Sequence, residues 1–314
     1  MNKRLKHWLI GLAVVLGVAV VADIAAGYYF YNVAVARGKK TFINNDSRIE
    51  KHDPQYREKT WYANAKKLTW HETAATDNLK LVANYVPAAK KTTKTVVIAH
   101  GFGGSSERMG AYAGLFHDLG YNVLLPDDRG SGQSQGNYIG YGWPDRLDYI
   151  KWIKQVIKHN GRDSQIVLFG TSMGGATTMM VSGEKTPVQL KAYIEDCGYT
   201  SVYDEIVYKA KQMYHLPEYP LVPTVSAINK LKNGYTFKQA SALNQVKKNH
   251  KPMLFIHGGN DDFVPTRMVY PLYRADRGPK QLLVVKGAAH AASFAHAPKL
   301  YTQTIRNFLA RYLN

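Results

Sequence analysis

Short apolar runs alternate with longer amphipathic stretches along most of the chain, from residue 95 onwards. The runs have the length of strands that are buried on both faces, and the stretches between them have the length of helices. Alternation of this kind implies right-handed crossovers and a mostly parallel sheet. The expected strands are residues 95–99, 121–125, 165–169, 190–194, 253–256 and 281–285, and the expected helices are residues 107–119, 144–158, 266–274, 298–312 and a helix that begins at Gly174.

Two segments depart from this alternation. Residues 67–73 and 79–86 flank the turn signal Asp77-Asn78, so we expect an antiparallel pair of strands there. Residues 199–251 are rich in tyrosine, proline and lysine, and we interpret them as a small helical cap over the sheet edge, with a long surface excursion as the alternative. The last predicted helix has one apolar face, made of Leu300, Ile305, Phe308, Leu309 and Tyr312.

The N-terminal segment has the pattern of a membrane-spanning helix. Three basic residues precede an apolar stretch from Trp8 to Tyr28, and about 20 residues are enough to cross roughly 30 Å of hydrocarbon. Aromatic residues at both ends suit the two membrane interfaces. Asp23 lies near one end, where its carboxylate can reach headgroups or water. We therefore expect a signal-anchor in residues 1–36, followed by a juxtamembrane connector in residues 37–65.

The orientation of this segment rests on its flanking charges. A short basic N-terminus favours N-inside, although Arg37, Lys39 and Lys40 nearly balance its charge. The rest of the chain then lies outside the cell membrane. The alternative is a signal peptide cleaved at the A-x-A sequence of residues 34–36, well past the apolar stretch. The first interpretation gives a single-pass membrane protein, the second a secreted one, and both export the remaining chain.

Composition and charge narrow the class of protein. A chain of 314 residues with 45% hydrophobic content can bury a large core. Its net charge of +18 favours anionic partners such as lipid headgroups or a cell-wall polymer. Because the basic residues are scattered, we expect no specific nucleic-acid interface. The lone Cys197 excludes an internal disulfide.

The sequence G-x-S-x-G at residues 170–174 follows an expected strand and precedes a helix. This spacing is typical of a nucleophile elbow, a sharp turn whose glycines let the helix pass close to the strand. Ser172 would stand at the helix N-terminus. There the backbone N–H of Met173 can stabilise an oxyanion, because the first N–H groups of a helix lack partners inside it. The alternative is a glycine-rich turn with an incidental serine.

Two further strand ends carry candidate catalytic residues, Asp261 in a D-x-x-V-P sequence and His290 in the loop after residues 281–285. The order Ser, Asp, His across successive strand ends is that of α/β-hydrolases. With HGFGG at residues 100–104 and DDRGSGQSQG at residues 127–136, the chain resembles the α/β-hydrolase superfamily. In particular it resembles bacterial serine hydrolases that join one N-terminal membrane segment to an esterase-like domain.

The resemblance covers about residues 66–313 and implies an α/β-hydrolase catalytic domain in residues 66–314, with the cap inserted at about residues 199–251. It implies Ser172 as the nucleophile, His290 as the base and Asp261 as the carboxylate that orients the base. The alternatives that stay open are Asp262 and Asp196 for the acid and His296 for the base.

The resemblance also places the second oxyanion donor at the backbone N–H of Phe102 and gives His100 and Arg129 bracing roles in the surrounding loops. No cluster of histidine, cysteine and aspartate has zinc spacing, and no glycine motif completes a dinucleotide fingerprint. We therefore expect neither a metal nor a cofactor. Cys197 is expected to be a small buried residue.

The predicted function is a serine hydrolase that cleaves carboxylic esters of small molecules through an acyl-enzyme at the outer face of the cell membrane. Hydrolysis of amides by a peptidase or amidase, and acyl transfer to an alcohol, would use the same residues and stay open. A contrasting alternative is a non-catalytic envelope-binding protein on a hydrolase fold.

Overall fold

The computed structural model describes residues 2–38, 40 and 49–313. Its centre is an eight-stranded sheet with strand order β1-β2-β4-β3-β5-β6-β7-β8. β1 and β4 pair antiparallel with β2, and the other neighbours are parallel, which confirms the predicted mostly parallel sheet. The strands are β1 (Leu68–Thr73), β2 (Lys80–Val86), β3 (Lys94–Ala99), β4 (Asn122–Pro126), β5 (Gln165–Thr171), β6 (Leu190–Asp196), β7 (Met253–Gly258) and β8 (Lys280–Val285).

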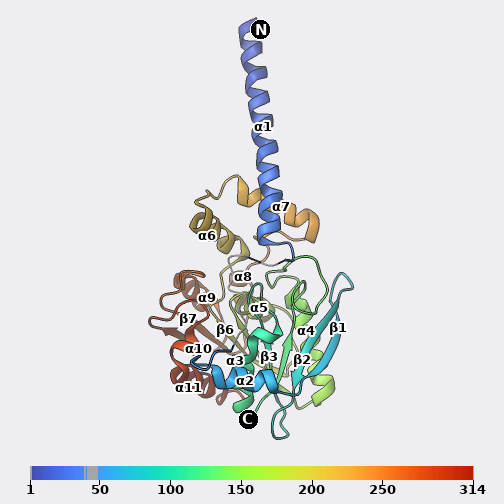
Figure 1. Cartoon of the computed structure of the whole chain (residues 1–314), viewed down its shortest axis with the longest axis vertical. Helices are drawn as coiled ribbons and strands as arrows, with labels where there is room; N and C mark the ends of the chain where they lie inside the picture. The colour runs from blue at the N-terminus through green and yellow to red at the C-terminus, as the bar shows by residue number, and fades with distance from the viewer. Residues whose placement is uncertain (1, 39, 41–48, 314) are drawn as a thin grey trace.

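Helices cover both faces of the sheet (Figure 1), and the inner strands β3 to β7 therefore consist mainly of buried residues. Along β3, Val97 and Ala99 belong to the core on one face, and Val96 and Ile98 to the core on the other. The first core includes residues of α4 (Asp145–Asn160), α5 (Met173–Ser182), α8 (Ala242–Val246) and α9 (Val269–Ala275). The second includes residues of α2 (Tyr56–Asn64), α3 (Gly110–Asp118) and α11 (Pro298–Leu309).

Three helices differ in detail from their prediction. In α11, Leu300 is 50% exposed and Tyr301 is buried instead. Tyr301 shares a stripe with Ile305 and Phe308 at spacings of four and three residues, whereas Leu300 is rotated by about 100° from that stripe. The expected helix at residues 107–119 begins as a 3₁₀ turn, η1 (Ser106–Met109), before α3. A second 3₁₀ turn, η2 (Thr266–Met268), precedes α9 in the same way.

The segment of residues 199–251 forms α6 (Val202–Tyr214), α7 (Leu221–Asn233) and α8. α6 and α7 lie at the end of the molecule from which α1 (Lys3–Ala34) projects as a long rod (Figure 1). α1 is long and apolar enough to cross a membrane, with a mean hydropathy of 2.6 over its most apolar part. The cap and the apolar helix are therefore at the same end of the protein.

The C-terminal part of α1 packs against the domain. Gly27 lies against the side chains of Thr224 and Ile228 in α7, with no room for a Cβ atom. Asp23, which we expected to reach headgroups or water, accepts a hydrogen bond from Thr224 Oγ1 instead. Hydropathy alone could not predict this contact, because the partner is 201 residues away in sequence.

The expected connector of residues 37–65 is described only in part, because residues 39 and 41–48 lie outside the described residues. Its last part forms α2, which packs against α3. The side chains of Tyr62 and Glu58 lie over Gly110 and Gly114, where a larger residue would clash.

A buried ion pair holds the loop after β4 in place. Arg129 is fully buried, and its guanidinium donates to both carboxylate oxygens of Asp148, at 2.6 and 2.9 Å. It also donates to Asp77 at 2.8 Å, in the turn between β1 and β2. Asp128 and Asp145 lie nearby, and burial raises the pKa of both carboxyl groups above their ordinary value. Arg129 is thus the cation among four acidic residues.

We predict that Arg129→Met lowers the free energy of unfolding by about 3–5 kcal/mol, because it leaves buried carboxylates without their counter-ion. Arg57→Met is the matched control, since Arg57 pairs with Asp118 at the surface and should change stability by about 1 kcal/mol at most. Thermal unfolding of both variants in detergent micelles measures the difference. Equal melting temperatures would show that the buried pair contributes no more than the exposed one.

Candidate active site

Ser172 occupies a strained turn between β5 and α5. Its backbone has φ 57° and ψ −119°, a conformation that costs energy for a residue with a side chain. A Cβ atom on Gly170 would lie 2.0 Å from the carbonyl oxygen of Gly174, and one on Gly174 would lie 2.1 Å from that of Ala99. Only glycine fits at these two positions. The G-x-S-x-G spacing thus lets α5 start close to β5 and β3.

The structure brings the three expected catalytic residues together from three separate strand ends. The Nε2 atom of His290 lies 2.9 Å from the hydroxyl oxygen of Ser172, and its Nδ1 atom lies 2.8 Å from Asp261 Oδ2. The ring of Phe263 stacks on the imidazole of His290, with ring centres 4.8 Å apart. The imidazole therefore has a fixed plane between hydroxyl and carboxylate.

The carboxylate of Asp261 is buried and fully hydrogen-bonded. Its Oδ1 atom accepts from the backbone N–H groups of Phe263 and Val264, at 3.0 and 2.9 Å. Burial would raise the pKa of Asp261, but the hydrogen bonds from His257 and His290 outweigh burial and lower it to about 2. Asp261 is therefore ionised at neutral pH, as a group that stabilises an imidazolium must be.

His257 also contacts Asp261, although we did not predict from the sequence that it belongs to the site. It is the next-to-last residue of β7 and is fully buried, and its Nε2 atom lies 2.9 Å from the carbonyl oxygen of Val264 and 3.3 Å from Asp261 Oδ2. Its imidazole thus approaches the same carboxylate oxygen that His290 contacts. The sequence feature that could have indicated this contact is the spacing of four residues between His257 and Asp261. In a turn, however, such spacing does not predict contact.

The alternative acids and the alternative base lie elsewhere. The side chain of Asp196 accepts a hydrogen bond from Tyr301 at 2.8 Å, and its backbone carbonyl accepts from the N–H of Ser172. Asp262 is exposed, and its backbone carbonyl accepts from Tyr208. His296 is exposed and lies against Gly287. Among these candidates, Asp261 and His290 are the pair that reaches Ser172.

The two expected oxyanion donors flank Ser172. Met173 is the first residue of α5, where backbone N–H groups point out of the helix end. The loop after β3 passes against Ser172, since a Cβ atom on Gly101 would lie 3.5 Å from that of Ser172. Phe102 follows in this loop, and its ring lies 5.1 Å from that of Tyr141. Both backbone segments therefore border the hydroxyl.

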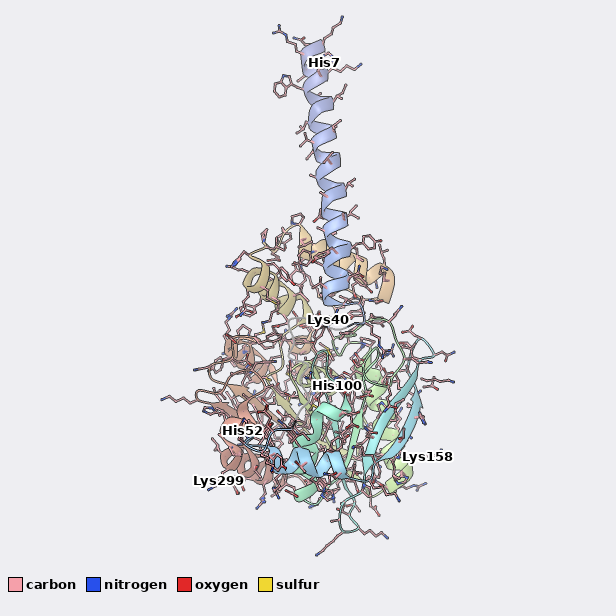
Figure 2. All side chains as sticks on the ribbon, in the orientation of Figure 1. His7, Lys40, His52, His100, Lys158 and Lys299 are labelled. Atoms are coloured by element: carbon pink, nitrogen blue, oxygen red, sulfur yellow. The ribbon has the colours of Figure 1, made fainter. Side chains whose placement is uncertain are left out.

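His100 holds the same loop and is not placed to act as a base. It is fully buried (Figure 2). Its Nδ1 atom lies 2.8 Å from the carbonyl oxygen of Gly101, and its Nε2 atom accepts from the N–H of Asp128 at 3.0 Å. Burial lowers the pKa of His100, which favours this neutral form. The imidazole thus ties the loop after β3 to the loop after β4.

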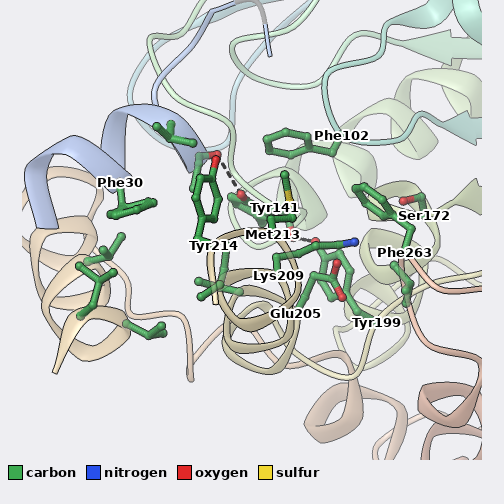
Figure 3. Close-up of a pocket in the computed structure, with 18 residues that line it drawn as sticks. Phe30, Phe102, Tyr141, Ser172, Tyr199, Glu205, Lys209, Met213, Tyr214 and Phe263 are labelled. Atoms are coloured by element: carbon green, nitrogen blue, oxygen red, sulfur yellow. Dashed lines mark hydrogen bonds between the residues drawn. The ribbon is translucent and has the colours of Figure 1, made fainter. Parts of the chain in front are cut away.

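An apolar cavity opens beside Ser172 (Figure 3). Aromatic residues from the core domain, among them Phe102, Tyr141 and Phe263, line one part of it. Glu205 and Lys209 of α6 also line the cavity. The rest comes from the cap and from α1: Phe30, Val33 and Ala34 of α1, and Leu221, Val222 and Val225 of α7.

Cys197, Asp261 and His290 are the one group of potential metal ligands that lie within 4.8 Å of one another in the described part of the chain. Cys197 is buried, and burial raises the pKa of its thiol far above the ordinary value. Metal binding needs the thiolate, and the other two residues already bond to each other. The set fits an ion poorly.

The chain matches one protein-family model and several sequence relatives. The family model described as serine aminopeptidase, S33, matches residues 90–215. The uncharacterised protein YqkD of Bacillus subtilis is 32% identical over 228 residues, which are 73% of this chain and 75% of the relative. The uncharacterised protein YfhR of Escherichia coli is 26% identical over 321 residues, covering 100% of this chain and 97% of its own.

Solved structures share the fold. An esterase of Pyrococcus furiosus superposes with a TM-score of 0.65 at 23% identity, over 80% of this chain and 92% of the esterase. A puromycin-hydrolysing peptidase of Mycobacterium tuberculosis gives a TM-score of 0.62 at 17% identity, over 80% of this chain and 40% of the peptidase. The fold predicted from the sequence is thereby confirmed. By its sequence relatives and its fold, the chain belongs to the α/β-hydrolase superfamily.

Proposed function

We propose that this protein is a serine hydrolase that cleaves carboxylic esters of small molecules through an acyl-enzyme. The observation that carries the proposal is the chain of hydrogen bonds from Ser172 through His290 to Asp261, with distances of 2.9 and 2.8 Å. Serine is a weak nucleophile until a base takes its proton, and this chain supplies an oriented base. A protein that only bound the cell envelope would have no use for it.

The reaction follows from this geometry. Ser172 Oγ bonds to the carbonyl carbon while His290 Nε2 takes the hydroxyl proton, and N–H groups of Phe102 and Met173 stabilise the oxyanion. The bond to the alcohol oxygen then breaks, and the alcohol leaves with the proton from His290. Water attacks the acyl-enzyme in the same way, which releases the carboxylic acid and restores Ser172. Asp261 stabilises the imidazolium in each half.

The cavity beside Ser172 supports the proposal that the substrate is an ester with an apolar acyl group. Its lining is dominated by aromatic and aliphatic side chains that reach Ser172, and such walls bind hydrocarbon by excluding water.

Hydrolysis of an amino-acid amide is a second candidate, favoured by one observation. Glu205 lines the cavity, is 5% exposed, and has one carboxyl oxygen without a hydrogen-bond partner in the described part of the chain. A carboxyl group so placed could accept from the α-amine of such a substrate. Turnover of amino-acid p-nitroanilides that is lost in Glu205→Gln would favour this candidate over the ester.

We also propose that α1 stays attached and anchors the domain outside the cell membrane, where the net charge of +18 favours anionic headgroups or wall polymer. Burial supports retention of α1. Tyr31 and Val35 are 6% and 0% exposed, and cleavage after Ala36 would remove both from the core. Fully burying one large apolar side chain contributes about 1.5–3 kcal/mol.

Ser172→Ala is expected to abolish labelling by a fluorophosphonate probe and to lower kcat/KM for p-nitrophenyl butyrate by about 10⁴-fold or more. Ser182→Ala is the control, because Ser182 lies on the same helix and donates to the carbonyl of Met179. It should keep labelling and turnover. Labelling that survives in Ser172→Ala would place the nucleophile elsewhere.

Asp261→Asn should lower kcat by about 10⁴-fold with little change in KM, because the amide no longer stabilises the imidazolium. Asp262→Asn should leave kcat near the wild-type value, because the side chain of Asp262 is exposed and its backbone carbonyl, which the substitution keeps, accepts from Tyr208 and Gln212. Steady-state kinetics with p-nitrophenyl butyrate compare the adjacent pair. Equal losses in both variants would contradict the assignment of Asp261.

Retention of α1 predicts that the protein recovered from the membrane fraction carries residues 1–36. Intact-mass measurement of the detergent-extracted protein checks this. A mature form that begins at residue 37 would sink the anchor proposal and favour the cleaved signal peptide.

A further inference from the structure

We infer that the C-terminal part of α1, residues 26–36, forms one wall of the acyl-binding pocket, and that the substrate is an amphiphile whose acyl chain reaches Ser172 from the membrane side. This inference rests on the proposed function, because it assigns a chemical class to the acyl group that Ser172 would accept.

The end of α1 is fixed firmly enough to be a wall. Tyr31 Oη accepts a hydrogen bond from Asn233 of α7 at 2.9 Å. The amine of Lys40, at the base of α1 (Figure 2), donates to the carbonyls of Val33 and Ala36 at 2.7 Å each. The backbone of Val35 accepts from the N–H of Ile139 at 2.8 Å. These contacts join α1 to the cap and to the core domain.

One cavity connects α1 to the nucleophile. Phe30 lies at one end and Ser172 at the other, as the close-up shows (Figure 3), and Val33 and Ala34 of α1 also line the cavity. The ring of Phe30 packs edge-on against Tyr214 of α6, with centres 5.1 Å apart. Phe30 and Tyr214 therefore border the gap between α1 and α6.

This end of the cavity lies beside the membrane-facing part of the protein. The apolar residues of α1 before Asp23 are exposed, and the helix leaves the domain next to α6 and α7 (Figure 1). If that part spans the hydrocarbon, Tyr28 and Tyr29, 46% and 61% exposed, lie at the interface, where aromatic residues are favoured. Phe30 is the next residue, so the α1 end of the cavity meets the bilayer surface.

The chemistry of the site assigns the two halves of the ester. The leaving alcohol must take its proton from His290, so it lies on the imidazole side of Ser172. In the described part of the chain, the cavity lining includes Ser172 but not His290. The imidazole is itself 19% exposed. The alcohol thus faces the imidazole and solvent, and the cavity remains for the acyl chain.

Glu205 and Lys209 are compatible with an alkyl chain. Burial raises the pKa of the Glu205 carboxyl group and lowers that of the Lys209 amine, so burial disfavours charge on both. The Lys209 amine donates to Gln212 and lies over the ring of Phe263, 3.4 Å from its centre. Its polar end is thus occupied, and its methylene groups can face the cavity.

The first test compares chain-length selectivity in the full chain, purified in detergent micelles. Val33→Trp fills the cavity beside α1 and should lower the ratio of kcat/KM for p-nitrophenyl decanoate to that for p-nitrophenyl butyrate by about tenfold or more. Val21→Trp is the matched control, because Val21 lies on the same helix, 68% exposed and outside the cavity. Its ratio should equal that of the wild type.

Phe30→Ala provides a second variant that removes bulk and should raise the same ratio several-fold. Fluorophosphonate labelling identifies variants with an intact site. If Val33→Trp is not labelled, the inference is tested by Phe30→Ala alone, and a ratio equal to that of the wild type would overturn it. Labelled variants that both keep the wild-type ratio overturn the inference while ester hydrolysis itself stands. A wild type that neither labels nor hydrolyses esters overturns the proposed function, and the inference with it.

The direction of the chain is tested directly with an alkyl fluorophosphonate that carries a diazirine near the end of a decyl chain. After reaction with Ser172 and irradiation, peptides of α1 or α6 should carry the crosslink, as mass spectrometry of the full-length protein would show. Crosslinks confined to peptides of the sheet domain would place the chain elsewhere and overturn the inference.

Discussion

The distance between α5 and the strands beneath it is the constraint on which the site depends. Gly170 and Gly174 let the first turn of α5 touch the carbonyl of Ala99, and this contact forces Ser172 into its strained conformation. The neighbouring strands β3 and β5 are buried and hold this contact in place. The same closeness brings the loop after β3 against the serine, so one packing contact positions both the proposed nucleophile and the loop that carries a proposed oxyanion donor.

A second layer of interactions fixes the loops that carry the remaining groups. His100 ties the loop after β3 to that after β4, and Arg129 ties the latter to α4 and to the turn between β1 and β2. Asp261 is held by two backbone N–H groups and by His257. Arg129, His100 and Asp261 are each buried with at least one hydrogen-bond partner, which is the condition under which buried polar and charged groups are tolerated.

Much of this was predictable from the sequence because it is local. The buried strands appear as apolar runs, and the elbow, the D-x-x-V-P sequence and His290 each follow a strand end. What could not be predicted depends on contacts distant in sequence. Hydropathy identifies α1 as apolar but does not tell lipid from protein, so the burial of Tyr31 and Val35 and the bond from Thr224 to Asp23 were missed. Leu300 was wrongly predicted to be on the apolar face of α11, because successive residues of a helix point in directions about 100° apart.

The burial of α1 against the cap also affects whether the domain can be separated from α1 without damage to its fold. Many membrane-tethered proteins join a catalytic unit to its tether through a spacer that can be cut without harm. Here the helix shares its last turns with the core, and Gly27, Tyr31 and Val35 are packed on protein. Release of the domain by a protease, or by truncation for soluble expression, would expose these packing surfaces. If α1 anchors the domain in the bilayer as we propose, separation from the bilayer would then alter the site around Ser172 as well as the location of the domain.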